Sequence, residues 1–170
     1  AFLPSVLAGR NIPCLIPLGA DQDVHFRLTR DVIGKLGYPK PAIIHSMFMP
    51  SLLGSGKMSA SLQDTTIYTV DNPDIVRQKI MKYAFSGGQA TIAEHRKLGG
   101  NPDVDVSYQW LRMLFEPNDA RLKKIHDDYI AGRLLTSELK EILIEKINNF
   151  LRHHQKEREK ARKKVSKYIF

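Results

Sequence analysis

Only two short segments of this chain are patterned as β-strands, and this scarcity limits the folds that it can adopt. Residues 14–18 form an apolar run bounded by prolines and by Gly19, as is typical of a buried parallel strand. Residues 42–48 form a second apolar run. Between the runs, residues 21–23 carry acidic side chains that favour the start of a helix, and Gly37 ends it. This order predicts a right-handed β–α–β crossover unit of an α/β sheet.

The helix between the two runs has a single apolar stripe. Its apolar residues recur every four positions, at Val24, Leu28, Val32 and Leu36. Two strands cannot form a stable sheet with helices on both faces, so we expect residues 1–70 to be the trailing half of a larger nucleotide-binding domain. The chain begins with Ala1 rather than Met, which also suggests an internal start.

After Pro73 the sequence is patterned almost wholly as helices, and no internal repeat is present. Asp103 or Asp105 is expected to cap the third helix and Thr136 the fifth. Together the segments predict an all-α domain over residues 71–170. Glycines or a proline separate the five amphipathic segments, which are residues 73–83, 91–98, 106–115, 119–131 and from 136 onward.

The chain is strongly basic, with a formal net charge of +8 and a pI of about 9.6. Such a charge favours a polyanionic partner such as nucleic acid, or it belongs to a basic surface that faces solvent. Residues 152–167 concentrate the charge, with eight Lys or Arg against two Glu. Both interpretations stay open for this run. Val165, Tyr168 and Ile169 could dock the end of the chain back onto the body.

Several kinds of site find no support in the sequence. Cys14 is the only cysteine, so no intramolecular disulfide can form, and its apolar neighbours indicate a small buried residue in a reducing compartment such as the cytoplasm. No run approaches the roughly 20 apolar residues of a membrane span. His95 with Asp103 and Asp105 lacks any metal-ligand spacing, so we expect no metal site. No GxGxxG stretch supports a nicotinamide-dependent oxidoreductase.

Residues 54–61, Gly-Ser-Gly-Lys-Met-Ser-Ala-Ser, carry the most informative chemistry. They are not a P-loop, because one residue rather than four separates the glycines and Met follows the Lys. What remains is a glycine-flanked loop that presents one ammonium, of Lys57, and two hydroxyls, of Ser59 and Ser61. These groups could hold phosphate oxygens and stabilise charge on a leaving group. The alternative is an exposed polar loop without a ligand.

This loop does not stand alone. Residues 57–61, KMSAS, resemble the KMSKS signature of class I aminoacyl-tRNA synthetases, and the version with Ala is similar to that of the eukaryotic and archaeal tryptophanyl enzymes. The tyrosyl enzymes share a KMSKS-type loop but not the stretches at 84–88 and 103–107. Further stretches match the tryptophanyl family in order and spacing over essentially the whole chain: residues 16–23, 26–27, 29–31, 37–41, 45–46, 84–88 (AFSGG), 94–96, 99–100 and 103–107 (DVDVS).

The resemblance implies a Rossmann-like catalytic domain followed by a helical anticodon-binding domain. The family activates tryptophan with ATP and Mg²⁺ and transfers it to tRNA(Trp), as a cytoplasmic homodimer. Attack is by the carboxylate of the substrate, so catalysis consists of positioning and electrostatics. Gln22 would help to bind the tryptophan ammonium group. The residues implied at the ATP are Gly19 and Asp21 near the ribose, Met58 beside the adenine, and the catalytic Lys57, Ser59 and Ser61 on the phosphates.

For the tRNA, the resemblance implies two contacts. Phe85 would stack on an anticodon base, and Lys140 would meet the anticodon from the helix that follows Thr136. Phe85 could instead be a core aromatic at a helix end. Vertebrate members carry an Arg-Asp pair after Ser-Gly-Gly, whereas this chain has Gln89 and Ala90, so part of that anticodon contact differs here.

One motif of the family has no counterpart in the chain. A class I enzyme binds the triphosphate with a HIGH-type motif on the first strand–helix turn, and no histidine here lies in such a context. We therefore expect this chain alone not to activate tryptophan. The alternatives that stay open are a non-catalytic, basic helical module that binds tRNA or other RNA, and a tyrosyl-tRNA synthetase.

Overall fold

The computed structural model describes residues 1–56, 58–59 and 61–167. They form two compact units, residues 1–48 and residues 49–170, which are described separately. The boundary predicted between two functional domains at residue 70 does not depend on where the compact units divide, and it stays a prediction.

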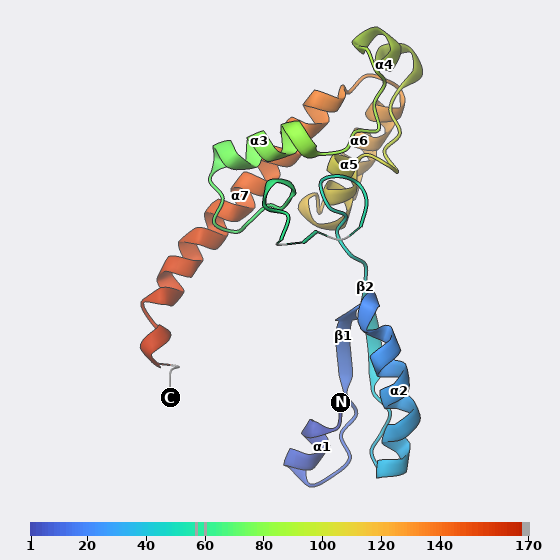
Figure 1. The fold of residues 1–170 in the computed structure, drawn as a ribbon, viewed down its shortest axis with the longest axis vertical. Coiled ribbons are helices and arrows are strands. Elements are labelled where there is room, and N and C mark those ends of the chain that lie inside the picture. Colours follow the sequence, from blue (N-terminus) through green and yellow to red (C-terminus); the bar gives the residue numbers. More distant parts are fainter. Residues whose placement is uncertain (57, 60, 168–170) are drawn as a thin grey trace. The chain divides into compact units, whose positions relative to one another are not determined.

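The first unit contains the expected β–α–β arrangement (Figure 1). Strand β1 (Leu15–Gly19) pairs in parallel with β2 (Ala42–Ser46), with Leu18 opposite His45. Helix α2 (Asp23–Ile33) lies between the strands in sequence, preceded and followed by the 3₁₀ turns η1 (Ala20–Gln22) and η2 (Gly34–Leu36). The predicted strands, helix and parallel order are therefore confirmed.

A short helix precedes β1 and was not predicted. Helix α1 (Leu3–Ala8) begins with Pro4 in its first turn and ends at Gly9, whose φ of 62° suits a residue without a side chain. Its Ser5 is buried and accepts a hydrogen bond from the Ile12 amide at 2.9 Å. Phe2 stacks on Tyr38 with ring centroids 5.3 Å apart, which holds the helix to the segment between η2 and β2.

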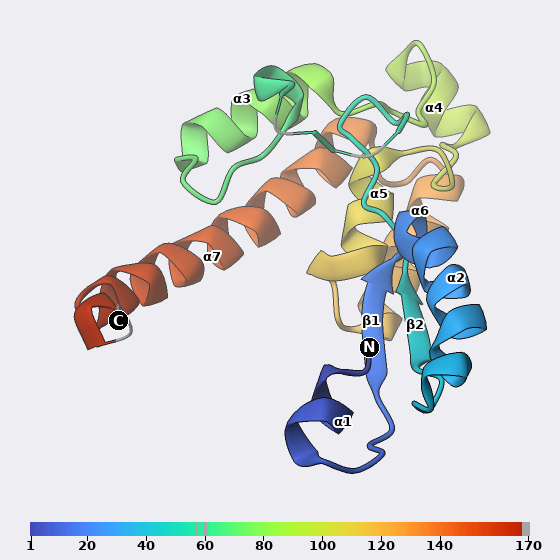
Figure 2. The same cartoon turned by 60° about the horizontal axis from the view of Figure 1, so that its bottom comes forward.

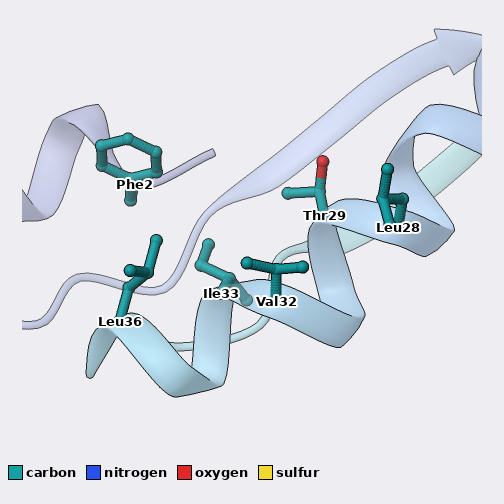
Figure 3. A pocket seen from close by; sticks show the side chains of 6 residues that line it. All are labelled: Phe2, Leu28, Thr29, Val32, Ile33 and Leu36. Carbon is teal, nitrogen blue, oxygen red and sulfur yellow. The ribbon is translucent and has the colours of Figure 1, made fainter.

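The apolar stripe of α2 is exposed within this unit. Val24, Leu28, Val32 and Leu36 are between 42 and 72% exposed. Figure 3 shows Phe2, Val32, Ile33 and Leu36 around a shallow hollow of about 300 Å³, to which Leu28 and Thr29 also contribute. The expectation that Cys14 is a small buried residue is wrong for this unit, because that side chain is only partly covered.

The second unit contains five α-helices in the described residues. A π-helical turn, η4 (Leu111–Phe115), continues α5, and two 3₁₀ turns are η3 (Gln63–Thr65) and η5 (Val165–Lys167). The positions of all five predicted helices are confirmed within a few residues. Their bounds are α3 (Pro73–Tyr83), α4 (Ile92–Leu98), α5 (Val106–Trp110), α6 (Asp119–Ile130) and α7 (Thr136–Arg162).

The helix caps settle one choice and correct another. Asp105, not Asp103, caps α5, because its carboxylate accepts the amides of Ser107 and Tyr108. The prediction that Thr136 caps α7 is wrong, since Thr136 is the first helical residue and the cap position falls on Leu135. The Leu135 amide donates to the Glu138 carboxylate at 2.7 Å, while the Thr136 hydroxyl turns to other partners.

The core of this unit lies among α3, α5, α6 and α7. Figures 1 and 2 both show α3 running alongside the first half of α7, and these two helices make extensive contact. Trp110 and Tyr108 belong to the core, as expected from the sequence. The loop before α3 joins the same core: Leu52 is fully buried there, and Met58 and Ile67 pack against it.

Helix α7 runs on past this core. In both views its C-terminal part extends as a straight rod beyond the other helices of the unit (Figures 1 and 2). Val165 is 47% exposed, so the predicted docking of the chain end is not observed for this residue; Tyr168 and Ile169 lie outside the described residues. Among the helices that the structure describes, none combines the length and the apolar character needed to cross a membrane.

Candidate functional site

The end of β1 brings the first group of predicted site residues together. Gly19 is the last residue of the strand, and the η1 turn places Asp21 and Gln22 directly after it, both exposed. A Cβ at Gly19 would lie 3.0 Å from the Asp21 Oδ1 and 3.2 Å from the Phe48 ring, so a side chain is tightly restricted here. Ligands of open α/β sheets bind at this carboxyl end of the strands.

An ionic cluster beside this turn was not predicted. The Asp23 carboxylate, at the start of α2, contacts the His45 Nε2 at 2.7 Å and the Arg27 Nε at 2.5 Å. Partial burial alone would raise the pKa of Asp23, but the hydrogen bond with His45 and the charge of Arg27 outweigh it and lower the pKa. The signal that could have revealed this cluster was the parallel pairing of the two strands, which puts His45, near the end of β2, opposite Leu18.

The loop that carries the two serines is closed on its C-terminal side. The Ser59 and Ser61 hydroxyls lie 2.8 Å apart, within hydrogen-bond distance. The Ser59 carbonyl accepts the Thr66 hydroxyl at 2.7 Å and the Leu62 amide at 3.0 Å. Met58 packs its side chain against the helical core. Lys57 lies outside the described residues, so its predicted contact with phosphates stays a prediction.

The N-terminal side of the same loop is folded around Ser51. The Ser51 amide donates to the Gly56 carbonyl at 3.1 Å, and its hydroxyl donates to the Ser55 carbonyl at 2.7 Å. Gly54 has a φ of 79° and lies directly against Phe85: a Cβ at Gly54 would be 3.1 Å from the Cβ of that phenylalanine. A glycine is therefore required at this position for two separate reasons.

Phe85, the predicted anticodon contact, is half exposed at 50%. Its backbone is fixed on both sides, because its amide donates to the Leu52 carbonyl at 2.7 Å and its carbonyl accepts the Val106 amide at 3.1 Å. The ring lines a hollow of about 390 Å³ together with Leu53, Gly54, Ser55, Asp103, Val104 and Gln109. Phe85 is thus not part of the buried core, and half of its side chain stays exposed.

A buried carboxylate organises the loop that follows Phe85. Asp105 is fully buried and accepts the Gly87 amide at 2.9 Å and the Tyr129 hydroxyl at 2.8 Å, besides capping α5. Burial and the nearby Asp105 charge raise the pKa of Tyr129 far above its usual range, so this hydroxyl stays protonated and donates. Thr136 completes the group, 3.1 Å from the Tyr129 hydroxyl.

Lys140, the second predicted anticodon contact, lies inside the helical unit. It is 9% exposed, and its ammonium donates to the Met81 carbonyl at 3.2 Å. Burial lowers the pKa of Lys140, while the charge of Asp105 opposes that change. The contact with an anticodon stays a prediction, and this position does not favour it.

The C-terminal part of α7 presents a basic face. Arg152, Lys156 and Lys160, with Lys163 directly after the last helical residue, recur at helical spacing and are exposed. Only Lys160 among these four has an ion pair within the described part of the chain, with Glu157 at 2.7 Å. Elsewhere in those residues, His, Cys, Asp and Glu side chains do not gather in groups of three or more that could hold a metal ion.

The sequence model of one family, tRNA synthetases class I (W and Y), matches residues 5–152. The tryptophan–tRNA ligase of Sulfurisphaera tokodaii is 60% identical over 158 residues, which are 92% of this chain and 42% of that protein. The chain therefore spans less than half the length of this curated relative.

Solved structures agree with the sequence relatives. The tryptophanyl-tRNA synthetase from Aeropyrum pernix K1 has a TM-score of 0.85 and 38% identity, over 92% of this chain and 43% of that one. The tyrosyl-tRNA synthetase from Aeropyrum pernix is less similar, with a TM-score of 0.65 and 25% identity over 88% of this chain and 44% of that one. This chain belongs to the class I tRNA synthetases for tryptophan and tyrosine, and its relatives place it with the tryptophan enzymes.

Proposed function

We propose that this chain supplies part of the ATP site and the tRNA-binding surface of a tryptophan–tRNA ligase. The observation that carries the proposal is the pair of serine hydroxyls, Ser59 and Ser61, held 2.8 Å apart in the KMSAS loop of a chain from this family. Two hydroxyls at this separation can donate to neighbouring oxygens of one polyphosphate.

The chemistry asks for positioning rather than for a protein nucleophile. The tryptophan carboxylate attacks the α-phosphate of ATP, and pyrophosphate leaves with its electron pair. Ser59, Ser61 and the ammonium of Lys57 would stabilise the negative charge that develops on the leaving group. Mg²⁺ would arrive with the ATP. At the end of β1, Gly19 leaves room for the ribose beside Asp21, and Gln22 would bind the tryptophan ammonium group.

The helical unit supplies the tRNA-binding surface in this proposal. The half-exposed ring of Phe85 offers a stacking face, and the basic face of α7 offers cations to the phosphate backbone. The domain assignment follows: residues 1–70 belong to the trailing half of a Rossmann-like catalytic domain, and residues 71–170 bind the anticodon. The exposed stripe of α2 supports this, because a larger domain would cover it. The homodimer and the cytoplasmic location stay predictions.

A chimera tests the proposal. The residues of this chain replace the matching segment of the Sulfurisphaera tokodaii ligase, and ATP–pyrophosphate exchange and charging of tRNA(Trp) are measured. We expect tryptophan-dependent exchange in the chimera and about a hundred-fold lower kcat after Lys57→Met or Ser59→Ala, since one such donor stabilises a transition state by about 3 kcal/mol. A correctly folded chimera that shows no pyrophosphate exchange, or one whose exchange prefers tyrosine, would contradict the proposal.

A non-catalytic RNA-binding module is the second candidate, and the basic face of α7 favours it. Two measurements together separate the candidates: tRNA binding by the 170-residue chain alone, and exchange activity of the chimera. Both candidates expect it to bind tRNA with strong salt dependence, and both expect no exchange activity from it alone. The module hypothesis gains only if the chimera is also inactive while the chain binds tRNA; normal turnover by the chain alone would refute our expectation that it cannot activate tryptophan.

A further inference from the structure

Lys79 is a nearly buried cation at the back of the serine-bearing loop. Its side chain projects from α3 and is 13% exposed. The ammonium lies 2.8 Å from the Thr66 carbonyl and 2.8 Å from the Asp71 Oδ2, and it sits 4.8 Å from the centre of the Tyr68 ring. Three partners of different kinds thus surround one charge, all from the segment that follows the loop.

Such burial has a cost that surface lysines avoid. Taking an ammonium and a carboxylate out of water is unfavourable, and their attraction offsets this only where the remaining hydrogen bonds are made. Here they are made: Asp71, 9% exposed, also accepts the Tyr68 amide at 3.0 Å. A buried ion pair is weak evidence for stability, but it can hold the groups around it in one arrangement. Here the ion pair holds the backbone carbonyl of Thr66, which accepts the Lys79 ammonium.

Thr66 connects this pair to the serines. Its carbonyl accepts the Lys79 ammonium, while its hydroxyl donates to the Ser59 carbonyl at 2.7 Å. Ser59 in turn lies within hydrogen-bond distance of Ser61 through the two hydroxyls. A continuous series of contacts therefore runs from α3 to both serine side chains, and Thr66 itself is buried.

Helix α7 holds the same segment from the other side. The Gln155 side-chain amide donates to the Thr69 carbonyl at 3.0 Å and to the Asp71 carbonyl at 3.2 Å. Asp71 is thus held by its carboxylate to α3 and by its carbonyl to α7. Two helices that pack on each other grip one short segment, which leaves it little freedom to shift.

We propose that Lys79 is a positioning residue, which acts through Thr66 to hold Ser59 and Ser61 where they meet the phosphates of ATP. The role at ATP rests on the function proposed above, whereas the hold on the serines rests on the contacts alone. Lys79 itself does not touch the substrate in this proposal.

Amide hydrogen exchange on the 170-residue chain tests the hold. Lys79→Met is compared with Lys123→Met, which removes an exposed lysine–aspartate pair of similar length, 2.7 Å, on α6. We expect the hydrogen-bonded amides of Leu62 and Thr65 to exchange at least about ten-fold faster in Lys79→Met, while α6 amides change less. Thr66→Val keeps Lys79 and removes only the hydroxyl, so it should speed exchange at Leu62 alone. Equal exchange of these loop amides in Lys79→Met and Lys123→Met would overturn the proposal.

Kinetics in the chimera test the role at ATP. We expect Lys79→Met to lower kcat for pyrophosphate exchange about ten-fold and to leave the KM for tryptophan unchanged, because the misplaced serines act on the phosphates alone. Lys79→Arg should restore part of the loss, since it returns a cation to the same carboxylate. Faster amide hydrogen exchange in the loop of Lys79→Met, together with an unchanged kcat, would overturn the positioning role. An inactive parent chimera would instead refute the proposed function. The comparison of amide hydrogen exchange between Lys79→Met and Lys123→Met would still decide whether Lys79 holds the serines.

Discussion

Replacing Asp105 tests whether one buried carboxylate organises the helical unit. In Asp105→Ala, α5 loses its cap, the Gly87 amide loses its acceptor, and the Tyr129 hydroxyl loses the carboxylate that accepts its hydrogen bond, while Thr136 stays 3.1 Å away. A lost cap costs about 1 kcal/mol and a part-buried amide without a partner about 1–2 kcal/mol. Loss of the charged hydrogen bond with Tyr129 adds about 1–2 kcal/mol more, so we expect about 3–5 kcal/mol less stability.

The assay is urea unfolding followed by the fluorescence of Trp110, the only tryptophan, which is 1% exposed. In a thermal scan the same loss should lower the midpoint by about 10 °C. Asp103→Ala is the matched control, because it removes an exposed carboxylate two residues away that does not cap the helix. We expect the control to change stability by less than about 0.5 kcal/mol.

Asp105→Asn separates the charge from the geometry. It keeps one acceptor oxygen for the amides at the start of α5, so its stability should fall between those of the parent and of Asp105→Ala. Two results would refute the reasoning: Asp103→Ala and Asp105→Ala equally destabilised, or Asp105→Ala within about 1 kcal/mol of the parent, which is the range of an ordinary surface cap.

Three further predictions concern other parts of the molecule. The hydrogen bond with Lys146 is the main cause that lowers the pKa of Glu116. The stability that Glu116 contributes is therefore present above the unfolded pKa near 4.5 and is lost as the pH falls through the lower folded pKa. Glu116→Gln should flatten the loss of stability below about pH 5 in acid titrations. Gly99→Ala should cost more than about 3 kcal/mol in thermal unfolding, because φ is 72° and the new Cβ would lie 1.7 Å from the Ile130 carbonyl oxygen, whereas Gly34→Ala meets no atom within 4 Å and should be neutral or stabilising. Lys156→Gln should reduce the salt slope of tRNA binding by about one, measured by anisotropy from 50 to 300 mM salt, and an unchanged slope would exclude a phosphate contact.

Much of the fold was visible in the sequence because its signals are local. The strands, α2 and the five later helices follow from apolar period, acidic starts and glycine stops, and each lies where predicted. Helix α1 was missed because its six residues show no full apolar period, and Phe2 and Ser5 stabilise it through contacts with distant residues. Thr136 has the residue type of a cap, but Tyr129 and Ser86 compete for its hydroxyl.

The sequence motifs predict a set of site residues but not how those residues are arranged. The motifs named Ser59, Ser61 and Phe85, yet nothing in their spacing indicates that Thr66 binds the Ser59 carbonyl or that Lys79 stands behind it. Those contacts join residues 7 and 13 positions apart across an irregular segment, where no period fixes which side chains meet. The burial of Lys140 was hidden for a different reason, since a lysine on a helix is usually exposed.

The contact between Gly54 and Phe85 links the two loops that carry these residues, so a substitution in one loop affects the other. Any larger residue at position 54 would need both an unfavourable backbone angle and a displaced aromatic ring, so a single substitution would disturb the serine-bearing loop and the loop that carries Phe85 together. Compensation by a second change at Phe85 could relieve the crowding but not the backbone angle. Natural variation in one loop is therefore constrained by the other, although 31 residues of chain separate them.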